Sequence, residues 1–525
     1  MNLRSFSTGH VALLALLAVG CESLGEQAPA LARGEKLSSP EAANAASVPV
    51  VESSEVPLVD LHGQTRDWIT AAGVKRLYAR SNRVWIRKKP SRGSNKLGYL
   101  RAGASAAITG APQLGDGCRG DWYPIAPSGF VCEGRSATFD ATDPVVAAMS
   151  EYAPDHTRRL PYVYGTVRKP GPVYGRLPTP EEMRTSEVGI DRRMDLWFEI
   201  GGEIGSTFAQ HVWLGADGEA PDPKIAWAEQ RTEPLPSFLR AGGAVPNFRR
   251  KPRDKNQLVL RRMRPKVGHS FVETFFWRGR RYGLSAEMEL LPTDRLRPIQ
   301  GSSFSGLEID ESVRFPFAMV RQIRGKYHDG SRALYRGVLQ LTGKKRFYSK
   351  VLHYETTDGK WVSDRVASKF DIAKKMPGWA LRGERWIDIS ISRQALILYE
   401  GETPVYATLV STGEAGLGDA SSTTATKRGI FRIHTKHVST TMSSSEVGEA
   451  FELRDVPYVQ YFDKQGYAIH GAYWHDRFGM PKSHGCINLA PEDARRVFHW
   501  TSPQVPDHWH GALSALKGTV VFIHP

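Results

Sequence analysis

The sequence predicts a mainly β protein that is divided into several domains. The chain has 525 residues, whereas a single hydrophobic core rarely extends beyond about 250–300 residues. Glycine and proline are frequent, with 50 and 33 residues, and both favour turns over long helices. The apolar runs are short, and several alternate with polar residues at the period of a strand. We therefore expect β-rich modules rather than helical ones.

Residues 1–20 are expected to be a signal peptide of the lipoprotein type. Arg4 supplies a positive start, and Val11–Val19 is an apolar run too short for a bilayer span, which needs roughly 20 residues. The segment ends in Leu-Ala-Val-Gly-Cys, which resembles a bacterial lipobox, although Ala18 departs from the commonest form. We expect lipidation at Cys21, which would anchor the chain to the inner or outer membrane. Plain secretion is the alternative.

Residues 21–73 are expected to form a flexible tether. The stretch up to about Val59 is rich in alanine, serine, glutamate and proline and has no clear period. An ordered extension that packs on the next module is the alternative interpretation.

Residues 74–140 predict a compact β-module. Strand-like stretches alternate with turn residues, and they are Val84–Arg87, Leu97–Leu100, Trp122–Ile125 and Gly129–Cys132. These patterns resemble a bacterial SH3-like barrel of the kind that binds wall material. Cys118 and Cys132 would then join adjacent strands in a disulfide, which persists in exported proteins. Closing a loop of this length contributes about 3 kcal/mol in the chain-entropy model.

Residues 149–310 predict a second β-rich domain, interpreted as SH3-like with a basic insertion. Tyr162–Gly165 and Gly171–Tyr174 are expected to be paired strands. Phe275–Leu284 is expected to be a hairpin that turns at Arg-Gly. Residues 311–380 continue in a β-like pattern and are expected to be a connector that packs on the last domain.

Positive charge is prominent, with a formal net charge of +15. Arg249–Lys266 alone contains nine basic residues and one acid, Asp254. This balance suggests anionic surroundings such as a cell wall or a membrane surface. A generally arginine-rich composition, with a solvated loop at 249–266, explains the same numbers. The sequence has no helix-turn-helix, zinc-finger or RNA-binding signature, so we expect no nucleic-acid partner.

Residues 381–525 are the best-defined domain. Their strand-like stretches are Trp386–Ile391, Gln394–Tyr399, Pro404–Ser411, Lys427–Ile433, Tyr467–His470 and Thr519–Ile523. The first three follow one another through tight turns and predict an antiparallel meander. Pro491 and the two acids after it predict a short helix, because proline fits the first helical turn and acids complement the helix dipole there.

One short motif in this domain points to chemistry. Cys486 is the only cysteine in the last third of the chain, and it lies in Ser-His-Gly-Cys-Ile-Asn, which begins at Ser483. Small residues beside a cysteine suit a tight turn that exposes the sulfur, and histidine can take the proton of a nucleophilic thiol. A zinc site made of His470, His484 and Cys486 is the chemical rival. No acid or second cysteine completes a usual ligand set, so we expect no metal.

The domain resembles the L,D-transpeptidase catalytic domain of the YkuD family. The resemblance is carried by His470-Gly471 and by the motif from Ser483 to Asn488, with support from Leu409–Gly413 and Gly429–Phe431. The sequence departs from the family in two places. Only twelve residues separate His470 from Ser483, which predicts a small lid loop, and Lys427 replaces the proline of Thr-Pro-x-Gly-x-Phe.

The resemblance implies a thiol mechanism without a cofactor, acting on peptidoglycan stem peptides at the periplasmic side of the cell envelope. His470 would be the base, with its ring oriented by the carbonyl of Gly471. Cys486 would attack the carbonyl that precedes the terminal D-alanine of a stem tetrapeptide. A second stem would then resolve the thioester and form a 3→3 cross-link.

The resemblance also implies roles for the neighbouring residues. Backbone N–H groups of His484, Gly485 and Cys486 would stabilise the oxyanion. Ser483, Asn488 and the side chain of His484 would shape and polarise the loop. The residues after Gly471 leave alternatives open. Tyr473 and Trp474 are interpreted either as a substrate-facing wall or as ordinary packing, and His475 as a plain loop residue.

Three other functions remain compatible with the sequence. The domain could be a catalytically silent wall-binding protein, although its full motif argues against this alternative. The same site could serve an L,D-carboxypeptidase, in which water resolves the thioester. It could also attach an envelope protein to the wall through a lysine.

Overall fold

The computed structural model describes residues 69–70, 73–200, 202, 235–242, 245–246, 257–444, 451–514 and 518–525. All of them belong to one compact unit, Leu58–Pro525. The expected signal peptide, Cys21 and almost all of the expected tether lie outside these residues, as does part of the basic stretch 249–266. No helix among the described residues is both long enough and apolar enough to cross a membrane. The fold is mainly β, as the sequence predicts.

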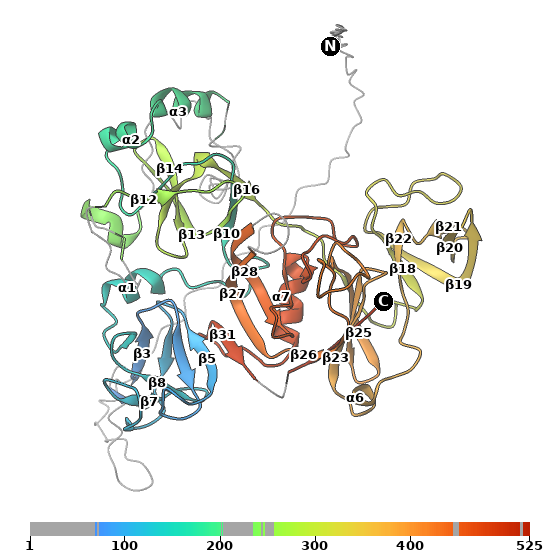
Figure 1. Cartoon of the computed structure of the whole chain (residues 1–525), viewed down its shortest axis with the longest axis horizontal. Coiled ribbons are helices and arrows are strands. Elements are labelled where there is room, and N and C mark those ends of the chain that lie inside the picture. Colours follow the sequence, from blue (N-terminus) through green and yellow to red (C-terminus); the bar gives the residue numbers. More distant parts are fainter. Residues whose placement is uncertain are drawn as a thin grey trace, which may run out of the picture. The chain divides into compact units, whose positions relative to one another are not determined.

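The C-terminal domain is built on two sheets (Figure 1). The first has six strands in the order β17 (Leu307–Glu308), β25 (Thr403–Leu409), β24 (Ala395–Glu400), β23 (Arg385–Ser390), β32 (Val520–His524) and β26 (Gly429–Arg432). β23, β24 and β25 form the expected antiparallel meander. β32 runs parallel to β23, so the last strand of the chain closes against the first strand of the domain.

The second sheet carries the sequence motif. Its strands in this domain are β27 (Thr435–Ser444), β28 (Phe451–Tyr461), β29 (Ala468–Gly471), β30 (Ile487–Leu489) and β31 (Gly511–Leu513). Buried apolar side chains from both sheets form one core, including Ile387, Leu398, Val438, Ile469 and Val521. Burying such side chains contributes about 1.5–3 kcal/mol each.

A helix follows the motif, as the proline and the two acids predict. α7 (Pro491–Trp500) begins with the proline and packs against β28 and β29 (Figure 1). Its C-terminal end is capped by a buried lysine, because Lys436 Nζ donates to the carbonyl oxygens of Phe498 and Thr501. A lysine amine at this end satisfies carbonyls that lack a helical partner, although burial lowers the pKa of Lys436 to about 7. The cap fixes α7 to β27 of the motif-bearing sheet.

The upstream module contains seven short strands. They are β3 (Arg76–Ala79), β4 (Val84–Arg87), β5 (Lys96–Leu100), β6 (Ser105–Ala107), β7 (Trp122–Pro124), β8 (Phe130–Cys132) and β9 (Ala137–Thr138), and they follow β1 (Ile69–Thr70) and β2 (Gly73–Val74). β6, β3 and β9 form one sheet, whereas β5, β4, β8 and β7 belong to another. Both contribute to one apolar core. Strand pairing does not close these strands into a barrel, so the SH3-like fold stays a prediction.

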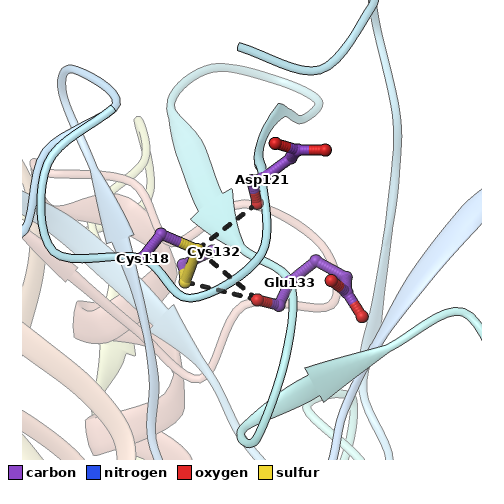
Figure 2. The surroundings of a disulfide bond; sticks show 4 residues. All are labelled: Cys118, Asp121, Cys132 and Glu133. Carbon is purple, nitrogen blue, oxygen red and sulfur yellow. Dashed lines mark hydrogen bonds between the residues drawn. A yellow bond between two sulfur atoms is a disulfide. The ribbon is translucent and has the colours of Figure 1, made fainter. Parts of the chain in front are cut away.

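A disulfide fixes one edge of this module (Figure 2). Cys118 and Cys132 are bonded, with their Cα atoms 5.7 Å apart. The pair joins a loop to β8 rather than two strands, because Cys118 precedes β7. The sulfurs lie near the carbonyl oxygens of Asp121 and Glu133.

The upstream module is joined directly to the C-terminal domain. β5 pairs antiparallel with β31, with Tyr99 opposite Gly511. Next to this pairing, the buried Arg101 donates to Asp455 Oδ1 of β28 at 2.7 Å. Burial alone would raise the pKa of Asp455, but the Arg101 guanidinium lowers it to about 2. Removing one partner of such a buried pair costs roughly 3–5 kcal/mol, so this contact holds the module in place.

The central region follows after α1 (Pro144–Ser150). Its strands are β10 (Val163–Val167), β11 (Pro172–Tyr174), β12 (Val259–Arg262), β13 (Gly268–Trp277), β14 (Arg280–Ser285), β15 (Leu290–Pro292) and β16 (Leu296–Ile299), and its helices are α2 (Pro180–Ser186), α3 (Ile190–Glu199), η1 (Ser237–Gly242) and η2 (Thr293–Arg295). β13 and β14 form the predicted hairpin, which turns at Arg278 and Gly279 with positive φ at both residues.

The predicted pairing of β10 with β11 is wrong. β10 pairs with β13 and β16, whereas β11 pairs with β12 and β15. Pro170 and Pro172 lack the N–H groups that a tight hairpin would use between these two strands. As in the upstream module, no closed barrel is formed by these pairings.

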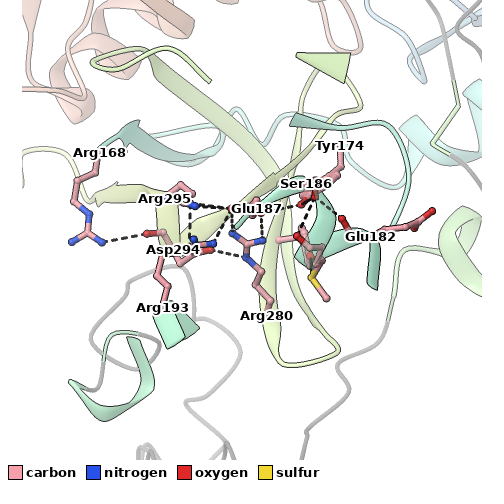
Figure 3. A network of polar contacts seen from close by, with 11 residues as sticks. Arg168, Tyr174, Glu182, Ser186, Glu187, Arg193, Arg280, Asp294 and Arg295 are labelled. Carbon is pink, nitrogen blue, oxygen red and sulfur yellow. Dashed lines mark hydrogen bonds and ion pairs between the residues drawn. The ribbon is translucent and has the colours of Figure 1, made fainter. Parts of the chain in front are cut away.

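A buried ionic cluster ties the first helices of this region to the hairpin (Figure 3). Glu187, which follows α2, is paired with Arg280 of β14 and with Arg295 at 2.7 Å. Arg280 also donates to Asp294 at 2.8 Å. Burial alone would raise the pKa of Glu187, but the arginines lower it to about 2.

The expected connector is a small sheet of its own. Its strands are β18 (Phe317–Val320), β19 (Val338–Tyr348), β20 (Val351–Thr356), β21 (Trp361–Ser363) and β22 (Ala367–Phe370), and α6 (Gly378–Leu381) follows. Phe317 and Phe370 belong to the same apolar cluster as Trp386 of β23. Residues of this sheet therefore pack against the C-terminal domain.

Candidate active site

Two parallel strands bring the separated parts of the motif together. β29 and β30 are paired with Ile469 opposite Ile487 and with His470 opposite Asn488. Side chains alternate along a strand with a period of two. His470 and Asn488 therefore lie on one face of the sheet. Cys486 lies in the turn directly before β30 and packs against the apolar cluster that contains Ala468 of β29. The fold thus brings the turn that carries the cysteine next to β29, the strand that carries the predicted base.

His470 is held as a neutral, oriented imidazole. Its side chain is buried, and Nδ1 lies 3.2 Å from the carbonyl oxygen of Gly471. Nδ1 must carry the proton to donate to this acceptor, which leaves Nε2 with its lone pair. Burial lowers the pKa of His470 to about 4, although the Gly471 carbonyl opposes this shift. The ring is therefore a neutral proton acceptor at neutral pH.

Cys486 is a free, half-buried thiol. Its Sγ lies 3.8 Å from the carbonyl oxygen of Gly466, to which the thiol donates. Burial raises the pKa of Cys486 to about 11, although the backbone N–H of Ala468 opposes this shift. Within the described chain, no hydrogen bond links Sγ to the ring of His470. The resting pair is a neutral thiol and a neutral imidazole rather than an ion pair.

The turn before Cys486 is fixed by a serine. Ser483 Oγ donates to the carbonyl oxygen of Cys486 and accepts from the N–H of Gly485 at 3.1 Å. This bond changes one expectation, because the Gly485 N–H already has a partner and is not available to an oxyanion. Gly485 has a φ of +117°, and a Cβ there would lie 2.8 Å from Cε1 of Tyr467. Only glycine fits this position without strain.

The side chain of the buried Thr426 holds the turn through hydrogen bonds. Thr426 Oγ1 accepts from the N–H of Gly413 and donates to the carbonyl oxygen of Gly485, both at 2.8 Å. The neighbouring segment is paired along its length, because the N–H of Glu414 donates to Ser483 and Ser411 exchanges two backbone bonds with Asn488. Lys427 replaces the proline of the family pattern, but this replacement leaves the supporting Thr426 in place.

The short loop 472–482 is held by the connector. Arg321 donates to the carbonyl oxygen of Gly479 at 3.0 Å, and Arg336 is paired with Asp476. Tyr335 also donates to the carbonyl oxygen of Asp476 at 3.3 Å. The connector thus fixes the loop that links the histidine to the cysteine motif.

His475 contacts a residue of the site, whereas the sequence analysis interpreted it as a plain loop residue. Its Nδ1 accepts from the N–H of Arg477 at 3.2 Å, so the neutral ring carries its proton on Nε2. Nε2 lies 3.0 Å from the side-chain amide of Asn488, whose oxygen accepts this proton once the amide is oriented for it. Burial lowers the pKa of His475 to about 4, with a contribution from His470. The residue was missed because this contact depends on the fold of the loop.

The other predicted site residues, Tyr473, Trp474 and His484, differ in how far they are buried. Tyr473 is fully buried, and its ring stacks on Tyr164 of the central region with centroids 4.1 Å apart. The structure therefore supports packing, and not a substrate wall, for Tyr473. Trp474 is half-buried, with its ring centroid 5.8 Å from that of His470, so it borders the site. His484 is exposed beside the cysteine.

The part of the chain that the structure describes has no cluster of three or more His, Cys, Asp or Glu residues suited to a metal ion. Comparison with known families decides the identity of the C-terminal domain. Residues 384–523 match the sequence model of the L,D-transpeptidase catalytic domain, YkuD. These residues form a YkuD-type L,D-transpeptidase catalytic domain. No curated protein matches the chain.

Solved structures of L,D-transpeptidases are similar to part of the chain. A mutant enzyme from Enterococcus faecium is 23% identical, with a TM-score of 0.21, over 27% of this chain and 50% of its own. An enzyme from Xylanimonas cellulosilytica is 21% identical, with a TM-score of 0.21, over 30% and 64%. The isolated catalytic domain from E. faecium is 23% identical, with a TM-score of 0.21, over 27% and 98%. The chain thus spans about half of the first of these proteins and less than two thirds of the second.

Proposed function

We propose that this protein is a peptidoglycan L,D-transpeptidase that forms an acyl-enzyme on Cys486 and makes 3→3 cross-links. The observation that supports the proposal is the parallel pairing of β29 with β30, which sets His470 opposite Asn488, two residues after Cys486. The orientation of the His470 ring adds support, because its bond to Gly471 leaves Nε2 able to accept a proton. Both groups belong to the L,D-transpeptidase catalytic domain.

The first half of the reaction is acylation. The thiol turns from the Gly466 carbonyl towards His470, and Nε2 takes its proton as sulfur attacks the carbonyl that precedes the terminal D-alanine. A neutral starting pair requires this proton transfer to accompany the attack, because free thiolate is scarce when the pKa is about 11. The C–N bond then breaks, and the imidazolium returns the proton to the amino group of the departing D-alanine.

The second half transfers the acyl group. An amine of a second stem attacks the thioester and loses a proton to His470. The C–S bond breaks, and the proton returns to sulfur, which restores the thiol. The oxyanion of each step is assigned to backbone N–H groups of the turn, with that of Cys486 as the proposed donor, because Ser483 engages the N–H of Gly485.

We further propose that the chain acts at the periplasmic side of the envelope. The pattern at residues 1–20 supports export, and Cys21 is the proposed lipid anchor. Residues 21–73 would be the tether, and residues 74–140 and 149–310 would hold wall material. Residues 381–525 would carry the chemistry, with residues 311–380 fixing its loop.

Intact-mass analysis tests the reaction. The full chain, incubated with a disaccharide tetrapeptide, should gain the mass of the substrate minus D-alanine, and Cys486→Ala should gain none. His470→Gln should form the adduct about 10²–10⁴-fold more slowly, which is the usual contribution of a positioned base. An adduct on the Cys486→Ala variant would refute the role of this cysteine.

The products distinguish the other candidate functions. A tripeptide product indicates a carboxypeptidase, and a conjugate to an added lysine-bearing envelope protein indicates protein attachment. If neither the tetrapeptide nor an acylating carbapenem modifies Cys486, the domain is a silent wall-binding protein.

A further inference from the structure

A basic groove lies between the upstream module and the catalytic domain. It has a volume of about 1210 Å³. One wall is formed by the end of β4, the turn after it and the start of β5, which contribute Arg87, Lys88 and Lys96. The other wall is formed by catalytic-domain residues that include Lys427, Arg432 and Lys464. We refer to these six residues as the groove cations.

The groove cations are poorly neutralised. Asp463 is the only carboxylate in the lining, and it is paired with Lys427 at 2.8 Å. Arg432 is paired at 2.8 Å with Glu384, which does not line the groove. No ion pair within the described part of the chain engages the other four cations. A concave surface lined by one sign of charge raises the local concentration of oppositely charged ligands.

Two lining residues of the groove are adjacent in sequence to residues that contact the turn of the proposed nucleophile. The turn between β28 and β29 lines it through Gln465, and the next residue, Gly466, accepts the hydrogen bond of the Cys486 thiol. On the other side, Lys427 directly follows Thr426, which holds the carbonyl of Gly485. The groove thus lies next to the segments that hold the cysteine turn.

The dimensions and chemistry of the groove point to a peptide. Small-molecule pockets usually have about 300–1,000 Å³, so this groove suits a segment of a longer chain. Asn95 and Gln465 add amide groups on opposite walls, and Phe462 and Leu513 add apolar surface. Lysine and arginine are the side chains that recognise carboxylates. A stem tetrapeptide carries at least its terminal carboxylate.

We propose that this groove binds the carboxylates of a peptidoglycan stem peptide, so that the upstream module is part of the substrate site. The inference rests on the proposed function for the identity of the ligand. The stem is either the donor that acylates Cys486 or the acceptor that resolves the thioester. Both present the same carboxylate chemistry, and the experiment below separates them.

Binding is measured first, on the full chain with Cys486→Ala, which cannot be acylated. A disaccharide tetrapeptide and its carboxamide analogue are titrated at low salt. Lys88→Glu should raise the Kd of the carboxylate peptide about 3- to 10-fold, because it reverses one charge in the groove. Lys89→Glu is the matched control, since Lys89 is also exposed but does not line the groove, and it should leave the Kd within about 1.5-fold. The difference should shrink at 1 M salt, where screening is strong.

Kinetics on the chain with Cys486 intact then identify the stem. If the groove holds the donor, Lys88→Glu raises the KM for D-alanine release in an assay whose only substrate is the tetrapeptide. If it holds the acceptor, only the KM of the added acceptor rises. Equal effects of Lys88→Glu and Lys89→Glu, or equal binding of the carboxamide analogue, would overturn the inference. A failure to acylate Cys486 would refute the proposed function but leave the binding result readable.

Discussion

Replacing Thr426 by valine tests how the nucleophile's turn is supported. Valine keeps the shape of threonine and removes the hydroxyl that bridges the N–H of Gly413 and the carbonyl of Gly485. Each of the two buried groups left without a partner costs about 1–3 kcal/mol, so we expect the turn to lose about 2–6 kcal/mol of local stability. A carbonyl released from its anchor moves the peptide unit that precedes Cys486, and small displacements of reacting groups cost about 10²-fold in rate.

Hydrogen exchange and acylation are the assays for this variant. Exchange should accelerate in peptides covering residues 411–414 and 483–488, while peptides from the upstream module stay unchanged. Thr426→Ser is the control, because it keeps the bridging hydroxyl and loses only a methyl group, which is worth about 1 kcal/mol. If Thr426→Val and Thr426→Ser exchange and acylate alike, the hydroxyl bridge does not position the turn.

Three further predictions follow from the titratable groups. Iodoacetamide should modify Cys486 at pH 7.5 roughly 300-fold more slowly than a free cysteine of pKa 8.5, with the rate rising up to about pH 11; a plateau near pH 8.5 would contradict the raised pKa. Burial raises the pKa of Asp493 to about 6 in the folded protein. The folded state therefore binds this proton more tightly than the unfolded state, and the resulting stability is lost as the pH rises through about 6. Relative to Asp493→Asn, stability should fall by about 2 kcal/mol as the pH rises from 4 to 7, measured by denaturant unfolding. His475→Ala should slow acylation about 10-fold by removing the contact to Asn488. Asn488→Ala should do the same, and the double variant should be no slower than either single one if the two residues act together.

The sequence was informative where local residue types determine the structure. Pro491 with its two acids predicted α7, and Arg278-Gly279 marked the turn of the β13–β14 hairpin. The glycine and serine of the cysteine motif predicted a tight turn, and the structure explains both residues through the φ of Gly485 and the bonds of Ser483.

The remaining features depend on contacts between distant residues. The long hairpin of β27 and β28 was not predicted, because its Ser/Thr-rich stretch after Val438 lacks the alternation of a half-buried strand. Arg101 and Asp455 are 354 positions apart, and nothing local in either segment predicts their pairing. The N–H of Gly485 was predicted as an oxyanion donor, and only the folded turn reveals its bond to Ser483. His475 was missed because its role is set by Asn488 across the loop.

The pairing of β5 with β31 has a consequence for where the catalytic domain ends as a folding unit. The family match begins at residue 384, but the outer strand of the motif-bearing sheet is completed by a strand from residues 96–100. A fragment cut at the start of the match would expose β31 as an open edge, with unpaired backbone groups that recruit other chains. It would also leave Asp455 buried without Arg101. The family match therefore begins well inside the part of the chain that these contacts hold together, which includes the upstream module.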